Sequence, residues 1–174
     1  MNGWNVINAL LFQGAWFACV LGGARGSSLW GAGAVAVMTA FALARHRWRS
    51  DVGFALAAAF IGFCLDTLWI RVGVLDYAGA SVAPVWIVLL WVGVGLSVNH
   101  SLAPFGARPW AGGLLAGLTA PVSYLGGERL GAVVVADATQ LALVGATWCA
   151  VFTLGFASAR AARARIAATH PAGS

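Results

Sequence analysis

Residues 51–71 read DVGFALAAAFIGFCLDTLWIR, and this stretch decides how the whole chain is interpreted. It is almost entirely apolar between its ends, yet it contains Asp66, one of only five acidic residues among 174. About 20 apolar residues in a helix are enough to cross the hydrocarbon core of a bilayer. We therefore interpret the stretch as a transmembrane helix that carries a carboxyl group near one end.

The composition of the chain also favours a membrane environment. Hydrophobic residues make up 61% of the sequence and charged residues only 9%, whereas soluble domains contain roughly 25% charged residues. The net charge of +5 could indicate a nucleic-acid partner, but the basic residues are all arginines in short segments between apolar runs. We interpret them as topology signals and expect no nucleic-acid binding.

Six apolar stretches are candidates for membrane spans, at residues 4–23, 28–44, 52–70, 84–98, 110–126 and 133–158. The last of them also has room to begin earlier. If the N-terminus is cytoplasmic, seven arginines lie in the inside segments and three, Arg25, Arg71 and Arg129, lie outside. Cytoplasmic loops carry this kind of excess. The N-terminal stretch lacks a basic segment before it, so we expect a retained helix rather than a signal peptide.

The expected fold is an all-α, polytopic membrane helix bundle with about six transmembrane helices and both termini in the cytoplasm. A single transmembrane domain is expected over residues 1–168, followed by a short cytoplasmic tail at 169–174. Small residues should allow close helix packing within the chain or at an oligomer face. They recur as Gly113 and Gly117 and every fourth residue at Ala32, Ala36, Ala40 and Ala44.

This topology predicts an outer polar cluster, in which Asp66 lies about 6 Å below the interface. Its members are Asp66, Trp69, Arg71, Tyr124, Glu128, Asp137 and Gln140. A carboxylate at such a depth is normally paired or faces a cavity. Two interpretations stay open. Either an Asp66–Arg ion pair or a Tyr124 hydrogen bond fixes the docking of the helix, or Asp66 forms the wall of an outward pocket that binds a ligand. Pro121 should kink its helix beside Tyr124, which favours a cavity there.

A second, inner polar cluster is predicted at the cytoplasmic side, comprising Asn5, Asn8, Gln13, Asn99, His100 and Ser101. Asparagines inside a bundle commonly bond between helices, and His100 is suited either to cap a helix end or to act as a base or ligand. The sequence contains no metal-binding spacing, nucleophile elbow, phosphate loop or dinucleotide fingerprint. We therefore expect no metal and no cofactor.

Five segments together resemble one known family. They are NALLFQGAWFACVLGGARG (8–26), the stretch around Asp66, PVWIVLLW (84–91), NHSL (99–102) and APVSYLGGERLGAV (120–133). The residues that carry the resemblance are Asn8, Gln13, Trp16, Asp66, Trp86, His100, Ser101, Pro121 and Tyr124.

The family resembled is an uncharacterised one, classed as a domain of unknown function, of small multi-pass bacterial inner-membrane proteins. Its genes often lie near those for cyclopropane-fatty-acyl-phospholipid-synthase-like methyltransferases. The resemblance thus implies an inner-membrane protein with a role in lipid metabolism or membrane stress, and it supplies no active site.

Three classes of function follow. The favoured one is a non-enzymatic accessory protein that binds a membrane lipid, a membrane-protein partner or a second copy of itself, because the chain is small and lacks a catalytic motif. The second is a lipid-modifying enzyme using Asp66 or His100 as general acid or base, although these two residues are expected at opposite faces of the membrane. The third is a small transporter or substrate-binding subunit with an outward pocket around Asp66.

Overall fold

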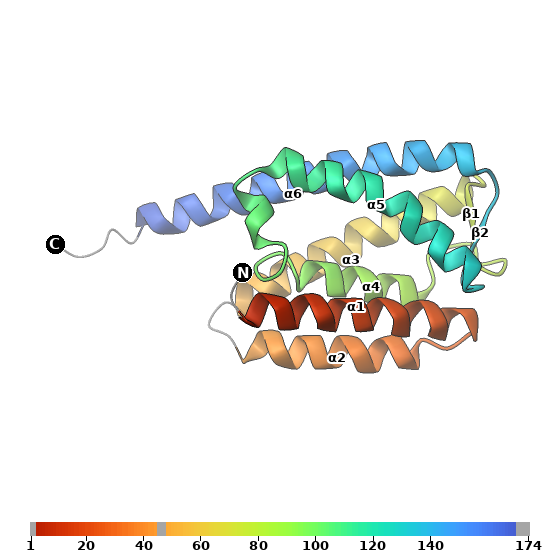
Figure 1. Ribbon diagram of the computed structural model, residues 1–174, viewed down its shortest axis with the longest axis horizontal. Coiled ribbons are helices and arrows are strands. Elements are labelled where there is room, and N and C mark those ends of the chain that lie inside the picture. Colours follow the sequence, from red (N-terminus) through yellow and green to blue (C-terminus); the bar gives the residue numbers. More distant parts are fainter. Residues whose placement is uncertain (1–2, 45–47, 170–174) are drawn as a thin grey trace.

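The computed structural model describes residues 3–44 and 48–169, in which six α-helices run back and forth along one axis (Figure 1). The helices are α1 (Gly3–Ala24), α2 (Leu29–Leu43), α3 (Trp48–Arg71), α4 (Val85–Gly95), α5 (Pro109–Arg129) and α6 (Leu141–Thr169). Their connections contain the strands β1 (Leu75–Asp76) and β2 (Val134–Val135) and the 3-10 turns η1 (Ala103–Gly106) and η2 (Ala138–Gln140). The prediction of an all-α, six-helix bundle is confirmed.

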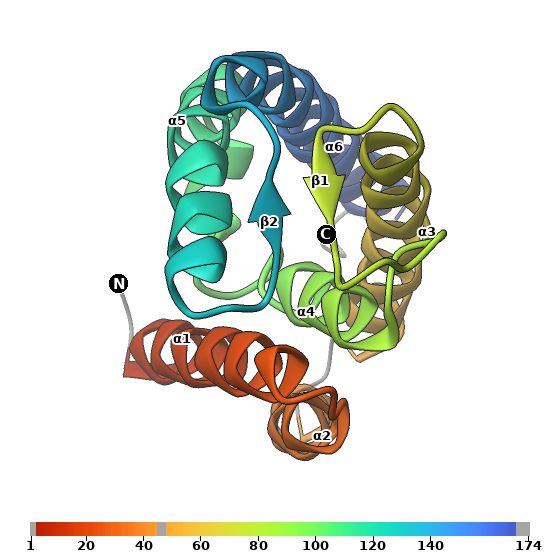
Figure 2. The ribbon, with the colours of Figure 1, turned by 90° about the vertical axis from the view of Figure 1, so that its right-hand side faces the viewer.

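An even number of antiparallel helices returns the chain to the end where it began. The beginning of α1 and the end of α6 therefore lie at one end of the bundle, which we call the terminus end (Figure 1). The two strands lie at the other end, which we call the strand end (Figure 2). Figure 2 views the molecule from the strand end and shows α4 near the middle, with α2 outermost beneath α1.

Helix α3 illustrates how the sequence distributes its residues. Its buried residues follow one another in steps of three, four or seven, the period of one helix face: Asp51, Ala55, Gly62, Asp66 and Trp69. The large apolar side chains Leu56 and Phe60 on its other side are 67% and 69% exposed. Carboxyl groups face inward and hydrocarbon faces outward, which suits a helix surrounded by lipid.

Three helices in the described part of the chain are long and apolar enough to cross a membrane, namely α1, α3 and residues Leu141–Ala161 of α6. These helices identify the chain as a membrane protein. Helices α2 and α4 are apolar but have only 15 and 11 residues, or about 22 and 16 Å of helix, against roughly 30 Å for the hydrocarbon core. Six complete crossings, with both termini in the cytoplasm, stay a prediction.

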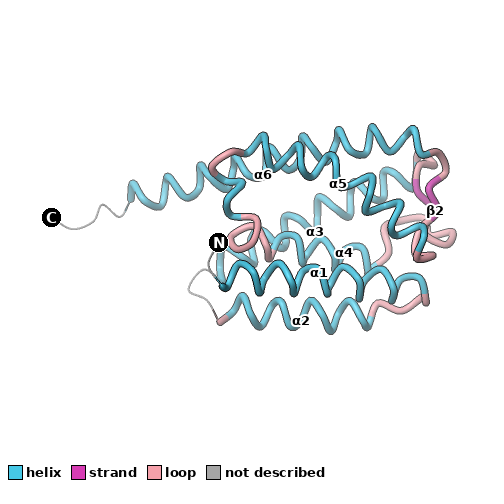
Figure 3. Tube along the Cα trace, viewed as in Figure 1, coloured by secondary structure: helices cyan, strands magenta, loops and turns pink. Residues whose placement is uncertain are grey.

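Helix α4 ends at Gly95, before the end of the predicted 84–98 span. Consecutive turns then lead to η1 (Figure 3), and all of residues 93–97 are buried. Irregular backbone at membrane depth is tolerated where protein covers it. The turns in this segment bring Asn99 and His100 back toward the start of α3.

Helices α5 and α6 form a tightly packed hairpin. A Cβ atom on Gly117 would lie 2.8 Å from both the Cβ of Cys149 and the carbonyl oxygen of Gly145, so only glycine fits at this crossing. The predicted close packing of Gly113 and Gly117 within the chain is confirmed.

The alanine repeat of α2 does not form a comparable contact. Ala36, Ala40 and Ala44 are exposed, so the prediction that they pack within the chain is wrong. The alternative, an oligomer face, stays a prediction. The helix instead buries a face made of Gly31, Val35, Met38 and Ala42.

The two strands tie the α3–α4 connection to the α5–α6 connection. They pair antiparallel, with Leu75 opposite Val135 and Asp76 opposite Val134. The predicted start of the sixth helix at residue 133, or earlier, is therefore wrong, since residues 134–140 form β2 and η2 before α6 begins at Leu141. The helix continues to Thr169, and the rest of the predicted tail lies outside the described residues.

Candidate functional site

Asp66 is completely buried and receives three hydrogen bonds from aromatic side chains. The hydroxyl groups of Tyr77 and Tyr124 donate to its Oδ1 atom over 2.8 and 2.9 Å, and the indole N–H of Trp91 donates to Oδ2 over 2.7 Å. Burial, followed by the charge of Asp66, raises the pKa of Tyr77 well above its usual value, so this hydroxyl remains a donor. The donors come from α4, α5 and the turn after β1, so the network joins these three segments to α3.

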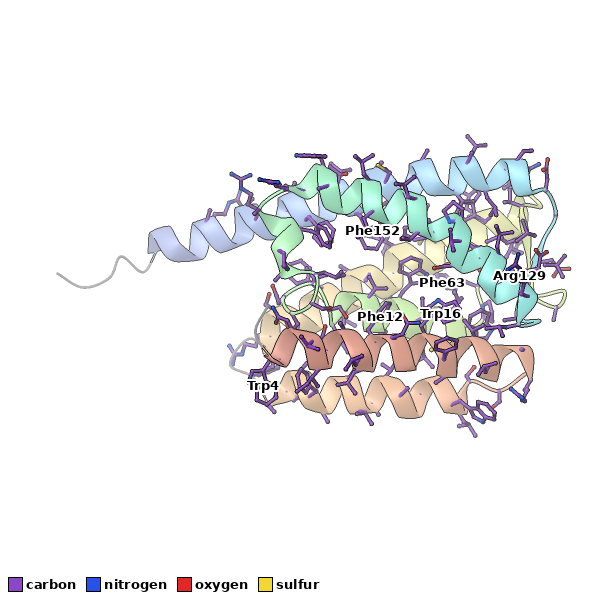
Figure 4. All side chains as sticks on the ribbon, viewed as in Figure 1. Trp4, Phe12, Trp16, Phe63, Arg129 and Phe152 are labelled. Atoms are coloured by element: carbon purple, nitrogen blue, oxygen red, sulfur yellow. The ribbon has the colours of Figure 1, made fainter. Side chains whose placement is uncertain are left out.

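No arginine whose side chain the structure describes pairs with Asp66, so the predicted Asp66–Arg ion pair is absent from the described residues. Arg71 and Arg129 are both exposed at the strand end, and Figure 4 shows Arg129 at the end of α5. The Tyr124 hydrogen bond, the other structural interpretation of Asp66, is formed.

Local backbone features hold two of the donors in place. Tyr77 precedes Ala78, which has a φ of 52° in the left-handed region, and the turn is closed by the Gly79 N–H donating to Asp76 over 2.7 Å. Trp91 lies against Gly62 of α3, where any Cβ atom would collide with the indole ring. Both features place an aromatic donor against Asp66.

An elongated cavity of about 220 Å³ lies next to this network. Tyr77, Trp91 and Tyr124 form its wall at the strand end, and the lining along α5 extends from Gly112 to Gly127, or about 22 Å of helix. Figure 4 shows Phe12 and Trp16 of α1 and Phe152 of α6 in the interior between these helices. The remaining walls are mostly apolar and come from α1, α4, α5 and α6.

A smaller recess of about 100 Å³ lies between α3, α4 and α6 and is lined largely by apolar side chains. It shares Trp91 and Trp148 with the larger cavity. Their rings stack with centroids 4.1 Å apart at an angle of 25°. The indole N–H of Trp148 lies near the Tyr124 hydroxyl, but the geometry does not complete a hydrogen bond.

The other predicted members of the outer cluster do not reach Asp66. Glu128 accepts a hydrogen bond from the Val135 N–H over 2.9 Å, and Asp137 accepts one from the Thr139 N–H over 2.8 Å, a bond that lowers the pKa of Asp137. These contacts order the connection between α5 and α6. Gln140 lies at the end of the same connection. Trp69 is buried, and its indole N–H forms no hydrogen bond with the described residues.

The inner cluster centres on Asp51, a residue absent from the prediction. Asp51 is fully buried at the start of α3. Its Oδ2 atom lies 3.1 Å from Nε2 of His100, and its Oδ1 atom accepts a 2.9 Å hydrogen bond from Asn99. His100 is thus the partner of a carboxyl group, and this carboxyl is 49 residues away in the sequence.

A second set of inner contacts lies beside this pair. The Ser101 hydroxyl donates to Asn8 over 2.7 Å, and the Asn8 amide donates to the carbonyl of Leu96 over 3.4 Å. These bonds fasten the turns after α4 to α1. Gln13 is exposed and takes no part, and Asn5 lies one turn before Asn8 on α1.

The sequence matches, over residues 5–154, the family described as "Protein of unknown function (DUF2878)". The chain belongs to this family. The resemblance to a family of unknown function is thereby confirmed. No curated protein and no solved structure matches the chain.

In this DUF2878 chain, neither polar cluster has the composition of a familiar catalytic or metal centre. Residues 3–44 and 48–169 contain no group of three or more histidine, cysteine or acidic side chains placed to hold a metal. The hydroxyl groups nearest His100 in sequence are already bonded, Ser97 to the Gly93 carbonyl and Ser101 to Asn8. What the DUF2878 fold offers is an apolar cavity with a polar wall.

Three residues of the DUF2878 site were missing from the predicted clusters: Tyr77, Trp91 and Asp51. One signal was available, since the chain has only two tyrosines and both donate to Asp66. The sequence distinguishes Trp91 only by its position inside the apolar 84–98 stretch. The Asp51–His100 contact joins segments too far apart for any sequence spacing to indicate it.

Proposed function

We propose that this protein binds the alkyl chain of a membrane lipid, or of a lipid-like amphiphile, inside its helix bundle as a non-enzymatic accessory protein. The observation that carries the proposal is the elongated, mostly apolar cavity between α1, α4, α5 and α6. Apolar cavities of comparable size take up hydrocarbon rather than water.

The size of the cavity suits part of one chain. An apolar cavity of about 150 Å³ holds benzene, with six carbons, so a volume of about 220 Å³ has room for roughly nine carbons on the same scale. The lining extends along about 22 Å of α5, which favours an extended chain over a compact ligand. A longer chain would continue from the cavity into the bilayer.

A lipid chain that continues from the cavity into the bilayer would pass between α1 and α5. Helix α5 packs along α6, while α1 packs along α2 and α4. Leu115 lines the cavity from α5 although it is 47% exposed, and Thr119 and Ser123 are likewise exposed lining residues. In a membrane protein this exposed side faces lipid, so a chain can enter sideways from the membrane.

A binding role is favoured over catalysis by the placement of the polar groups. Asp66 and Asp51 lie 15 residues apart on α3, or about 22 Å, so His100, beside Asp51, is too far from Asp66 to act with it on one substrate. We also regard the transporter function as secondary, because the polar groups of the described chain do not form a continuous path along the bundle.

The test compares two variants of α5 that each introduce a phenyl ring. Ala116 lines the cavity, whereas Leu118 is 72% exposed and is absent from the lining. We expect wild-type protein purified in a mild maltoside detergent to retain lipid detectable by native mass spectrometry. Ala116→Phe should lose most of it, and Leu118→Phe should retain it. Protein free of lipid in the wild type, or full retention in Ala116→Phe, would overturn the proposal.

The membrane orientation is proposed on separate grounds, the excess of arginines in the segments predicted to be cytoplasmic. A cytoplasmic reporter fused to the last residue should be active and a periplasmic reporter inactive. The opposite result would reverse the orientation and place Asp66 near the cytoplasmic face.

A further inference from the structure

The buried carboxyl group of Asp66 has donors but no counter-charge. All three of its hydrogen-bond partners are neutral, and each of them donates, which matches the lone pairs of an ionised carboxylate. Buried charges are normally paired with an opposite charge. None of the arginines whose side chains the structure describes supplies that charge.

The cavity reaches this carboxylate through aromatic rings. Tyr77, Trp91 and Tyr124 each bond to Asp66 and also line the cavity. The Tyr77 ring packs edge-on against Trp86, another lining residue, at 5.5 Å. The faces of tryptophan and tyrosine rings attract cations, most strongly where water is excluded.

The surrounding charges at the strand end also favour a cation. This end carries four of the five acidic residues, Asp66, Asp76, Glu128 and Asp137, and only three of the ten arginines, Arg25, Arg71 and Arg129. All three arginines are exposed. Arg25 donates to the Leu21 carbonyl and lies over Trp30, both outside the cavity lining.

We infer that the amphiphile held in the cavity carries a positively charged amine, which lies against Tyr77, Trp91 and Tyr124 with Asp66 as its counter-charge. This inference rests on the proposed function and adds the chemical class of the ligand. The amine can belong to a free long-chain amine or to the headgroup of an aminophospholipid.

The experiment uses three ligands with the same twelve-carbon chain: dodecylammonium, dodecanol and dodecanoate. Their dissociation constants are measured by tryptophan fluorescence in a neutral maltoside detergent for wild type, Asp66→Asn and the control Asp137→Asn. Asp137 is an exposed acid at the same end, and its contact with the Thr139 N–H lies outside the turn that holds Tyr77. Partitioning of each ligand into the micelle is the same for every variant, so the ratio between variants reports on the protein.

We expect Asp66→Asn to weaken dodecylammonium binding at least about tenfold and to change dodecanol binding less than about threefold. Asp137→Asn should bind both as wild type does. Dodecanoate should bind more weakly than dodecanol to wild type. If Asp66→Asn does not fold, the wild-type comparison decides: after each dissociation constant is corrected for that ligand's own partitioning into the micelle, equal affinity for the three ligands overturns the inference.

The outcomes separate the two proposals. Binding of all three chains without preference overturns the amine inference and leaves the chain-binding function intact. Failure of every chain to bind overturns both. Lysophosphatidylethanolamine is then compared with dodecylammonium, and tighter binding of the former assigns the amine to a phospholipid headgroup, whereas tighter binding of the latter assigns it to a free amine.

Discussion

Asp51 and Asp66 lie on the same face of the same helix and are both completely buried, yet their surroundings differ in kind. Asp51 contacts His100, a residue that can itself carry a positive charge, together with the amide of Asn99. Asp66 contacts only neutral aromatic donors. The first site can complete its charge balance within the protein, so its role is to fasten the turns after α4 to α3. The second cannot do so with the described residues, and it borders a cavity.

The largest effect is expected from removing the Asp66 carboxyl group. Asp66→Ala leaves Tyr77, Trp91 and Tyr124 without their shared acceptor. Each unsatisfied buried donor costs about 1–3 kcal/mol, so three of them should lower the free energy of unfolding by at least about 3 kcal/mol. Reversible unfolding in mixed micelles measures the change, with Asp137→Ala as the exposed control outside the Tyr77 turn. A loss below about 1 kcal/mol would show that the aromatic network does not hold α3, α4 and α5 together.

The next prediction tests how tightly that network is packed. Gly62→Ala would place a Cβ atom within the Trp91 ring and displace the indole from both Asp66 and Trp148. We expect a loss of about 1–3 kcal/mol of stability together with a shift in tryptophan emission.

The matched control is Gly53→Ala on the same helix, because nothing lies within 4 Å of a Cβ atom there. It should raise the free energy of unfolding slightly, since alanine is favoured over glycine in a helix by up to about 1 kcal/mol. Equal effects of the two substitutions would contradict the close approach of Trp91 to α3.

The third prediction concerns the other aspartate. A double-mutant cycle with Asp51→Asn and His100→Gln measures the coupling between the two side chains. We expect a coupling free energy of about 1–2 kcal/mol, within the range for directly contacting polar residues. The same cycle between His100→Gln and Asp66→Asn should give no coupling, because these residues lie at opposite ends of the bundle. Coupling of equal size in both cycles would remove the distinction between the two sites.

The smallest effect is expected at the turn that orients Tyr77. Ala78 has a φ of 52°, a region that costs a non-glycine residue roughly 1–2 kcal/mol, while glycine loses more chain entropy on folding. Ala78→Gly should therefore raise the free energy of unfolding by about 0.5–1 kcal/mol. Measured melting curves in detergent would show a small increase in Tm, and a decrease would indicate that the turn has a different conformation.

Much of the fold could be predicted from the sequence because the length of an apolar stretch and the positions of the charged residues between stretches are local properties. The first five helices lie within a few residues of the predicted stretches, apart from the early end of α4. The start of α6 could not be predicted, because Val134 and Val135 are as apolar as the helix that follows them. They form a strand with β1 instead of the first turn of the helix.

The candidate site was less accessible to sequence reasoning. Asp66 and Tyr124 were predicted to lie at the same depth, and their hydrogen bond is observed. Tyr77 was hidden in a connecting loop, and only the folded turn brings it back against α3. The pairing of Asp51 with His100 depends on the chain leaving helical geometry after Gly95, which a continuous apolar run does not reveal.

Binding of an amine-bearing lipid in the cavity is tested most directly by a structure of the protein in lipid nanodiscs that contain an aminophospholipid. We expect continuous chain-like density that enters between α1 and α5 and ends against the Tyr77, Trp91 and Tyr124 rings, with Asp66 behind them. A cavity closed by rearranged side chains, or one filled with ordered water, would contradict this expectation.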